Sequence, residues 1–225
     1  MEHTADAILH HLKSLASPEN VAGMARYGIN PHNMLGVSIY TLRPIAKEIG
    51  SDHALALQLW DAGIHEARLL ASYVDDPAQV TEEQMEAWGR DFDSWDVCDQ
   101  VCGLFEETRF AWQKAIEWSS RPEEFVKRAA FALMAGFAVH DKQAGDERFE
   151  QFFPIIVREA SDGRNFVKKA VNWALRNIGK RNRRLNDLAI ETARQIQRID
   201  SRVACWIAAD ALRELASDKI QARLS

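Results

Sequence analysis

The sequence predicts an all-α fold in which antiparallel helix pairs are stacked into one array. Three observations predict it. Strand-like alternation of apolar and polar residues is almost absent, apolar residues recur at helical spacing, and the turns between these segments are short. With 225 residues, 47% of them hydrophobic, the chain can bury a sizeable core without disulfides. Charged residues make up 27%, so nothing in the composition indicates wholesale disorder.

Helix-ending and helix-starting signals divide the first half of the chain. Ser17-Pro18 ends the first helix, Ser51 or Asp52 is the expected N-cap of the third, and the sequence 75–77 closes the fourth. Thr81–Gln84 has the capping-box pattern of a helix start. The helices expected in this half cover residues 2–15, 41–49, 54–60, 65–74, 81–88 and 93–107.

The second half contains longer helices and an internal repeat. The helices expected here cover residues 110–119, 122–139, 146–160, 164–179, 186–198 and 201–216. Phe125–Leu133 aligns with Phe166–Ala174 at a spacing of 41, and Arg202–Ala208 resembles both more loosely. A period near 40 in an all-helical chain is typical of HEAT-like helix pairs. No linker interrupts the pattern, so we expect one HEAT-like domain over residues 1–225, a curved solenoid whose concave face is lined by one helix of each pair.

Charge is distributed unevenly along the chain. The net charge is −5, but residues 1–120 hold 8 Lys/Arg against 19 Asp/Glu, whereas residues 121–225 hold 20 against 14. The segment 164–184 contains eight basic residues and no acidic one. Such a segment can capture phosphates despite an acidic total, although charge alone slightly favours a solvated basic face.

The cysteines and the apolar runs indicate a cytoplasmic protein. Three cysteines without close pairing fit a reducing compartment, and Cys98 and Cys102 are expected to be buried apolar residues rather than metal ligands. No apolar run approaches the roughly 20 residues of a membrane span, and the N-terminus does not have the pattern of a secretory signal.

Two tryptophans and a carboxylate are the most informative residues. Trp95 and Asp99 lie at i and i+4 of an expected helix, so one face presents an indole and a carboxylate, whereas Asp96 is expected to face another way. Trp173 lies in the basic segment. An aromatic wall, a carboxylate and a run of cations suit an anionic ligand that develops positive charge while bound. The remaining tryptophans are expected in the core: Trp60, Trp88, Trp112, Trp118 and Trp206.

Three motifs resemble a known family, the AlkD-type DNA alkylation repair proteins, which are HEAT-like alkylpurine DNA glycosylases. Ser94–Asp99 matches the family's Trp-Asp-x-x-Asp motif, and Phe166–Arg176 matches its Lys-Ala-x-x-Trp-x-Leu-Arg motif. Met24–Tyr27 followed by Leu35–Val37 matches a third segment, and Ser38 stands where the family pattern has a glutamine shortly afterwards. The three motifs occur in the family's order across nearly the whole chain.

The resemblance implies a function and a set of site residues. It implies excision of N3- or N7-alkylated purines from duplex DNA without base flipping, metal or cofactor. We expect a monomer, which is all that DNA wrapping by a solenoid needs, and association with the nucleoid when the protein binds DNA. It makes Asp99, Trp95 and Trp173 the catalytic residues. Arg128 is the expected cleft arginine and Tyr27 a further cleft aromatic. Cations of the basic segment are expected to add electrostatic attraction for DNA: Lys168, Lys169 and Arg176.

Two other functions compete with the glycosylase. One is a HEAT-like protein that binds DNA or a branched structure without chemistry, and the other is a protein-interaction scaffold that recognises partners through its concave face.

Overall fold

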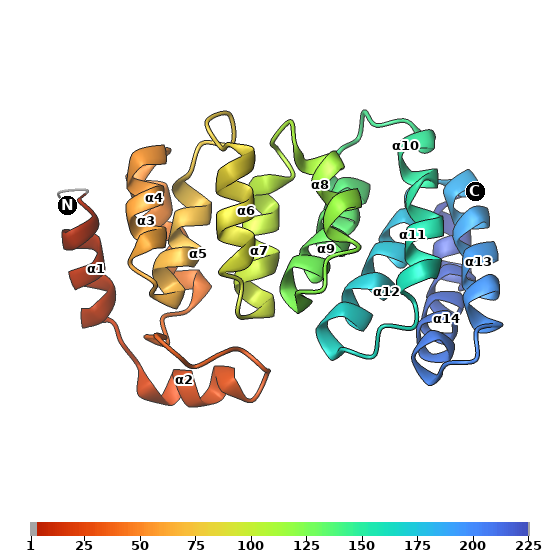
Figure 1. The fold of residues 1–225 in the computed structure, drawn as a ribbon, viewed down its shortest axis with the longest axis horizontal. Helices are drawn as coiled ribbons and strands as arrows, with labels where there is room; N and C mark the ends of the chain where they lie inside the picture. Colours follow the sequence, from red (N-terminus) through yellow and green to blue (C-terminus); the bar gives the residue numbers. More distant parts are fainter. Residues whose placement is uncertain (1–3, 225) are drawn as a thin grey trace. The chain divides into compact units, whose positions relative to one another are not determined.

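The computed structural model describes residues 4–224, and every regular element among them is an α-helix (Figure 1). The all-α prediction is therefore confirmed for the described part of the chain. The helices are α1 Ala5–Ser14, α2 Pro18–Ala25, α3 Ile39–Ile49, α4 His53–Asp61, α5 His65–Val74, α6 Glu82–Arg90, α7 Trp95–Phe105, α8 Ala111–Trp118, α9 Glu124–His140, α10 Asp146–Glu150, α11 Phe152–Glu159, α12 Asn165–Gly179, α13 Arg183–Gln197, α14 Arg202–Leu215 and α15 Asp218–Arg223.

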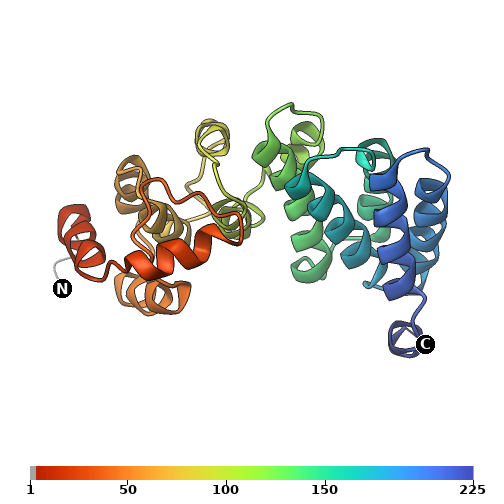
Figure 2. The same cartoon turned by 90° about the horizontal axis from the view of Figure 1, so that it is seen from below.

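The contacts divide the chain into two compact units. Unit 1 is residues 1–109 and unit 2 is residues 110–225, and each is described by itself. The helices of unit 1 run from red to yellow-green in Figures 1 and 2, and those of unit 2 from green to blue. That both units form one HEAT-like domain stays a prediction.

In unit 1, α5 packs against α3, α4 and α7, and its buried face supplies much of the core. Leu69 and Leu70 of α5 are fully buried, as is Leu59 of α4. Trp60 and Trp88 stack with ring centroids 4.0 Å apart, and both are buried, as predicted. Burial of such large side chains stabilises the helix pairs because each removes an extensive apolar area from water.

In unit 2, α9 is the central helix and packs along α8 and α12. Its buried face is rich in alanine, and Ala129, Ala130 and Ala170 are fully buried, so these small side chains let α9 and α12 approach closely. Gly179 at the end of α12 has the same role, because a Cβ there would lie 2.7 Å from the Ala189 Cβ. Trp118 is fully buried as predicted, and Trp112 stacks on Phe137 at 4.2 Å.

Helix boundaries follow their capping residues more closely than the apolar pattern does. Ser17-Pro18, expected only to end a helix, also starts α2: the Ser17 hydroxyl accepts from the Asn20 N–H, and proline occupies the first turn. Asn182 accepts from the Leu185 N–H, which starts α13 three residues earlier than expected. The helix expected over 146–160 is interrupted at Gln151, and α15 was not predicted.

The capping box at α6 forms only in part. The Thr81 hydroxyl accepts from the Gln84 N–H at 3.1 Å, as the motif predicts. The Gln84 side chain, however, donates to the buried Asp75 carboxylate at 2.6 Å. The motif therefore starts the helix while its glutamine joins α6 to the end of α5.

Candidate functional site

The first turn of α7 positions Trp95 by bonds to a loop far away in sequence. The Trp95 Nε1 donates to the Tyr27 carbonyl oxygen at 3.1 Å, and the Asn30 N–H donates to the Ser94 hydroxyl at 2.9 Å. Ser94 is fully buried and precedes the helix, so its hydroxyl joins the loop to α7 rather than capping α7. Asp99 follows Trp95 by one turn, and both side chains are half-buried. Of the predicted site residues, the structure therefore brings together Tyr27 and Trp95 in unit 1.

Asp96 does not face away from the Trp95 side, contrary to the prediction. Its Oδ2 lies 2.9 Å from the His65 Nε2, and it lines the same pocket as Trp95. The physical reason is that Asp96 is in the first helical turn, where its side chain reaches across to the start of α5. The other carboxylate oxygen, Oδ1, is buried without a hydrogen-bond partner.

The pKa of His65 is raised above its ordinary value of 6.5. Burial is the largest single influence and lowers the pKa, but it is outweighed by the hydrogen bond that His65 donates to Asp96 and by the negative charges of Asp96, Glu66 and Asp93. His65 and Asp96 thus form a buried ion pair directly beside Trp95. Through this contact His65 joins the start of α5 to the first turn of α7.

A pocket of about 680 Å³ opens beside Trp95 within unit 1. Its walls include Tyr27 and Tyr40, which are 77% and 79% exposed, together with Asp96, Gln100 and Ser38. Asp99 does not line this pocket, although it lies one turn from Trp95 on α7. The pocket is mostly apolar and aromatic, which suits the faces of a base or a sugar. Tyr40 was not singled out in the sequence because nothing local marks it as exposed.

The Leu35–Val37 motif is held by a buried carboxylate. Glu66 is fully buried and accepts the backbone N–H groups of Leu35, Gly36 and Val37 at 2.9, 2.6 and 3.1 Å. Gly36 has φ of +81°, and a Cβ there would lie 2.3 Å from the Ser17 carbonyl oxygen. The motif therefore shapes the loop that carries Ser38 to the pocket. The only feature of the sequence that could have identified Glu66 as important is that it is an acidic residue on the apolar face of a helix.

In unit 2, Arg128 joins two helix starts. The side chain is 6% exposed, and its Nη1 donates to the Phe166 carbonyl oxygen at 2.7 Å. Phe125 and Phe166, which the internal repeat aligns, pack with ring centroids 5.5 Å apart. Arg128 thus links equivalent turns of α9 and α12. Contact of Arg128 with DNA stays a prediction.

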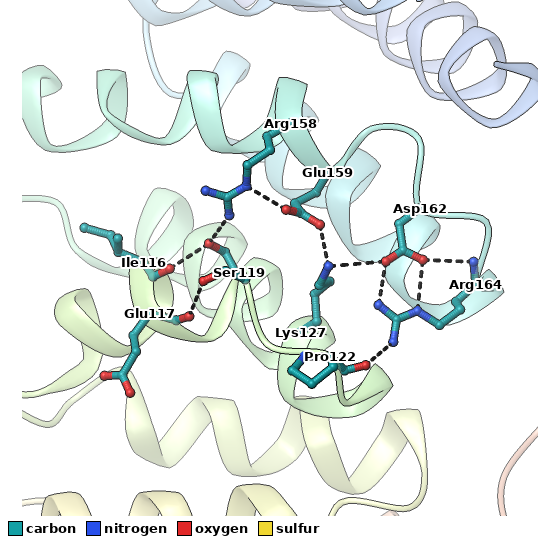
Figure 3. A network of polar contacts seen from close by, with 10 residues as sticks. Ile116, Glu117, Ser119, Pro122, Lys127, Arg158, Glu159, Asp162 and Arg164 are labelled. Carbon is teal, nitrogen blue, oxygen red and sulfur yellow. Dashed lines mark hydrogen bonds and ion pairs between the residues drawn. The ribbon is translucent and has the colours of Figure 1, made fainter. Parts of the chain in front are cut away.

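A network of buried charges fixes the same two helix starts (Figure 3). Lys127 pairs with Glu159 at 2.5 Å and with Asp162 at 3.5 Å, and each of the three side chains is at most 12% exposed. Asp162 also pairs with Arg164, which donates to the Pro122 carbonyl oxygen. Burial raises the pKa of Asp162, but bonds from Arg164 and the charge of Lys127 hold it below its ordinary value. The segment before α12 is thereby tied to the start of α9.

The basic segment 164–184 is far less cationic in space than in sequence. Arg176 pairs with Asp210 at 3.1 Å and with Glu214 at 2.8 Å, both on α14. Lys168 lies 4.7 Å from the centroid of the Trp206 ring. Lys169 is exposed and Trp173 is half-buried, so this part of α12 remains accessible. The predicted DNA-binding roles of Lys168 and Arg176 would have to compete with these contacts.

Trp206 is not in the core, contrary to the prediction. It is 42% exposed, because the buried stripe of α14 runs through Ala204, Ile207 and Ala208 and leaves Trp206 on another face. Cys98 and Cys102 are buried as predicted. Among residues 4–224 no cluster of three metal-ligating side chains occurs, and no helix is both long and apolar enough to cross a membrane.

The predicted site residues fall in both units. Tyr27, Trp95 and Asp99 belong to unit 1, and the others belong to unit 2: Arg128, Lys168, Lys169, Trp173 and Arg176. That the two groups face one cleft is a prediction.

Comparisons with known proteins agree with this fold. A solved structure described as "a new family of proteins related to the HEAT-like repeat DNA glycosylases with affinity for branched DNA structures" matches with a TM-score of 0.81 at 18% identity, covering 98% of this chain and 96% of that one. A designed armadillo repeat protein in complex with the peptide (KR)4 matches with a TM-score of 0.40 at 15% identity, covering 81% and 78%, and carries no argument.

At 18% identity, the first match supports the HEAT-like helical-repeat fold alone. No curated protein sequence matches the chain. The model of the family described as "DNA alkylation repair enzyme" matches residues 8–215, which is nearly the whole chain. The chain therefore belongs to the family of DNA alkylation repair enzymes.

Proposed function

We propose that the protein is a DNA glycosylase that excises cationic N3- or N7-alkylated purines from duplex DNA by hydrolysing the N-glycosidic bond. The observation that carries the proposal is the first turn of α7. There the Trp95 indole is fixed by the Tyr27 carbonyl, and Asp99 follows one turn later with its side chain half-buried. Membership of the DNA alkylation repair family supports DNA as the partner.

The chemistry of a cationic purine explains why few groups suffice. An N3- or N7-alkylated purine already carries positive charge and leaves without a general acid. Catalysis must therefore stabilise the positive charge that develops on the sugar. Cleavage develops oxocarbenium character at C1′, as in other glycosidic reactions. Asp99 would stabilise that cation and help to deprotonate the attacking water. The interaction raises the rate because it is stronger in the transition state than in the bound substrate.

Trp95 and Trp173 are proposed to contact the deoxyribose. An indole face attracts cations by roughly 0.5–2 kcal/mol, so each ring would favour the developing charge. Arg128 and Lys169 would contact phosphates and set the register of the DNA. In this proposal the damaged base is not flipped into a pocket, no metal or cofactor takes part, and the protein acts as a monomer. The reducing cytoplasm is the proposed compartment, in agreement with three free cysteines.

A second candidate is a DNA-binding protein without chemistry. It is favoured by the first structural match, whose description gives affinity for branched DNA structures. That candidate predicts tighter binding of four-way than of linear duplex DNA and no base release. A protein-interaction scaffold would instead bind DNA weakly and with little dependence on salt, since phosphate contacts impose a steep salt dependence.

The experiment is release of free bases from methylated duplex DNA by the wild type, Asp99→Asn and Asp61→Asn. Asp61→Asn is the matched control because Asp61 is an exposed aspartate at the end of α4. We expect the wild type and Asp61→Asn to release 7-methylguanine or 3-methyladenine. Asp99→Asn should lose about 10²–10³ in rate while still binding DNA.

The outcomes separate the candidates. Equal release by the wild type and Asp99→Asn would keep the enzyme and refute the role of Asp99. Binding without release of any base by the wild type would favour the non-catalytic candidate. Equal losses in Asp99→Asn and Asp61→Asn would mean a general effect of charge rather than catalysis.

A further inference from the structure

A second pocket in unit 2 is lined by cations and lies apart from the predicted catalytic residues. It has a volume of about 670 Å³ and is formed where α9, α12 and α15 end. Figure 2 shows the short α15 at the dark-blue end of the chain. The polar side chains in its wall are Lys142, Asn177, Lys180, Arg181, Asn182 and Arg223. Four of these are basic, and none of the described residues that line the pocket is acidic.

Two of the cations have neutral partners. Arg181 donates to the carbonyl oxygens of Ala144 at 2.8 Å and Ala138 at 3.4 Å, and its guanidinium lies 4.5 Å from the Phe149 ring centroid. Arg223 donates to the Lys180 carbonyl oxygen at 2.7 Å. These bonds satisfy carbonyls at helix ends but leave both formal charges in place. Each guanidinium has five N–H donors, so donors remain for a ligand.

Lys142 and Lys180 add two further positive charges to the pocket wall. Lys142 is exposed and forms no ion pair within the described part of the chain. Lys180 pairs with Glu214 at 2.8 Å, but that carboxylate also serves Arg176. The Asp146 carboxylate accepts from the side-chain amide of Asn182 at 2.8 Å, so it lies next to the pocket wall.

The charges add up to a positive pocket. Against the four cations stand the carboxylates of Glu214 and Asp146, which bond to lining residues, and the C-terminal ends of α9, α12 and α15. The N-terminal end of α13 at Asn182 adds positive charge, and each helix end contributes roughly half a charge. The balance is positive by about one charge. A concave surface with this excess attracts an anion.

The pocket continues the face of α12 that carries Trp173. Asn177 and Lys180 follow Trp173 at i+4 and i+7, so all three lie on one side of the helix. Seven residues advance about 10 Å along a helix axis, which equals about three nucleotide steps of one DNA strand. A DNA strand that runs parallel to α12 would therefore reach both places.

We propose that this pocket binds a backbone phosphate of the DNA, about three nucleotides from the sugar held at Trp173. The inference rests on the proposed function in placing DNA along α12, and it adds a contact that the motifs do not contain. The bound group is a phosphodiester, which carries one negative charge and two accepting oxygens for the arginine and lysine donors.

The test measures binding of lesion-free duplex DNA at several salt concentrations. Lys142→Glu is the main variant because the side chain is exposed and its loss leaves the fold intact. Arg223→Gln is the second variant, since it removes a charge that another helix, α15, brings to the pocket wall. Lys47→Glu is the matched control: Lys47 is an exposed lysine of α3 outside this pocket. Thermal unfolding of each variant checks the fold.

We expect Lys142→Glu to weaken binding roughly fivefold and to reduce the slope of log affinity against log salt by about 1. Arg223→Gln should reduce the slope similarly, whereas Lys47→Glu should bind like the wild type. Wild-type affinity and slope in both pocket variants would overturn the proposal. An equal loss in Lys47→Glu would also overturn it, because the effect would then be one of net charge.

Single-turnover base release at saturating protein distinguishes this proposal from the proposed function. The control Lys47→Glu should release bases at the wild-type rate. If the wild type binds DNA but releases no base, the glycosylase proposal fails. The pocket proposal is still tested in that case, by comparing the salt dependence of DNA binding between the wild type and the pocket variants. If bases are released and the slopes do not differ, the pocket proposal fails alone. Failure of the wild type to bind DNA would overturn both.

Discussion

At the scale of single residues, buried carboxylates of unit 1 organise the surroundings of Trp95. Glu66 holds the Leu35–Val37 loop, and Asp96 holds His65 beside the pocket. Neither residue is proposed to touch the reacting sugar. Their role is to keep the loop and the first turn of α7 in a fixed arrangement, which an active site requires.

Glu66→Gln should destabilise the protein by about 3 kcal/mol. The glutamine would retain one accepting oxygen but place an amide NH₂ against backbone donors in a fully buried site. Chemical denaturation measures the loss, with Glu83→Gln as the control because Glu83 is exposed on α6. The control should change the free energy of unfolding by less than about 0.5 kcal/mol. A similarly small change in Glu66→Gln would show that the three N–H bonds contribute little.

His65 should make stability depend on pH. Its folded-state pKa is raised, so the stabilisation is fully present below the unfolded value of 6.5 and is lost as pH rises through the folded pKa. His65→Gln should therefore remove a decline in the free energy of unfolding above pH 6.5. Denaturation across this range compares the wild type with His65→Gln and with His32→Gln, an exposed control. Parallel curves for all three proteins would contradict the buried ion pair.

At the scale of helices, ion pairs differ in importance according to their burial. The Lys127 network holds the starts of α9 and α12, and its side chains are almost inaccessible to water. The pair between Arg184 and Glu150 is of the same chemical type but largely exposed, with side chains 65% and 32% accessible. Water screens the second pair, and its long side chains lose conformational entropy when they pair.

Lys127→Ala should cost about 3–5 kcal/mol of stability, because it leaves Glu159 and Asp162 as buried charges without their central partner. Arg184→Ala should cost no more than about 1 kcal/mol. Urea denaturation of the two variants gives the comparison directly. Equal losses would mean that burial does not decide the strength of these pairs.

At the scale of the whole molecule, the sequence predicts the fold better than it predicts the site. Helical spacing of apolar residues and the 41-residue repeat identify the all-α architecture because both are local properties. The helix α2 was missed because Ser17-Pro18 serves both to end one helix and to start the next. Short helices such as α15 contain too few residues for a periodic pattern.

The surroundings of the site depend on contacts between distant residues, which no local pattern reveals. Trp95 is fixed by Tyr27, 68 positions away, and Asp96 by His65, 31 positions away. Arg176 and Lys180 of the basic segment pair with acidic residues of α14, so the charge of the segment along the chain overstates its charge in space. The motif residues themselves were found because their spacing on one helix is visible in the sequence.

The central claim is that Asp99 of unit 1 and Trp173 of unit 2 act on the same deoxyribose. The most direct test is a double-mutant cycle of single-turnover base release from a duplex with one 7-methylguanine, using Asp99→Asn, Trp173→Leu and the double variant. We predict release by the wild type, a loss of about 10²–10³ in Asp99→Asn, and little further loss in the double variant. The absence of release by the wild type, or a double-variant loss equal to the product of the two single losses, would contradict the account.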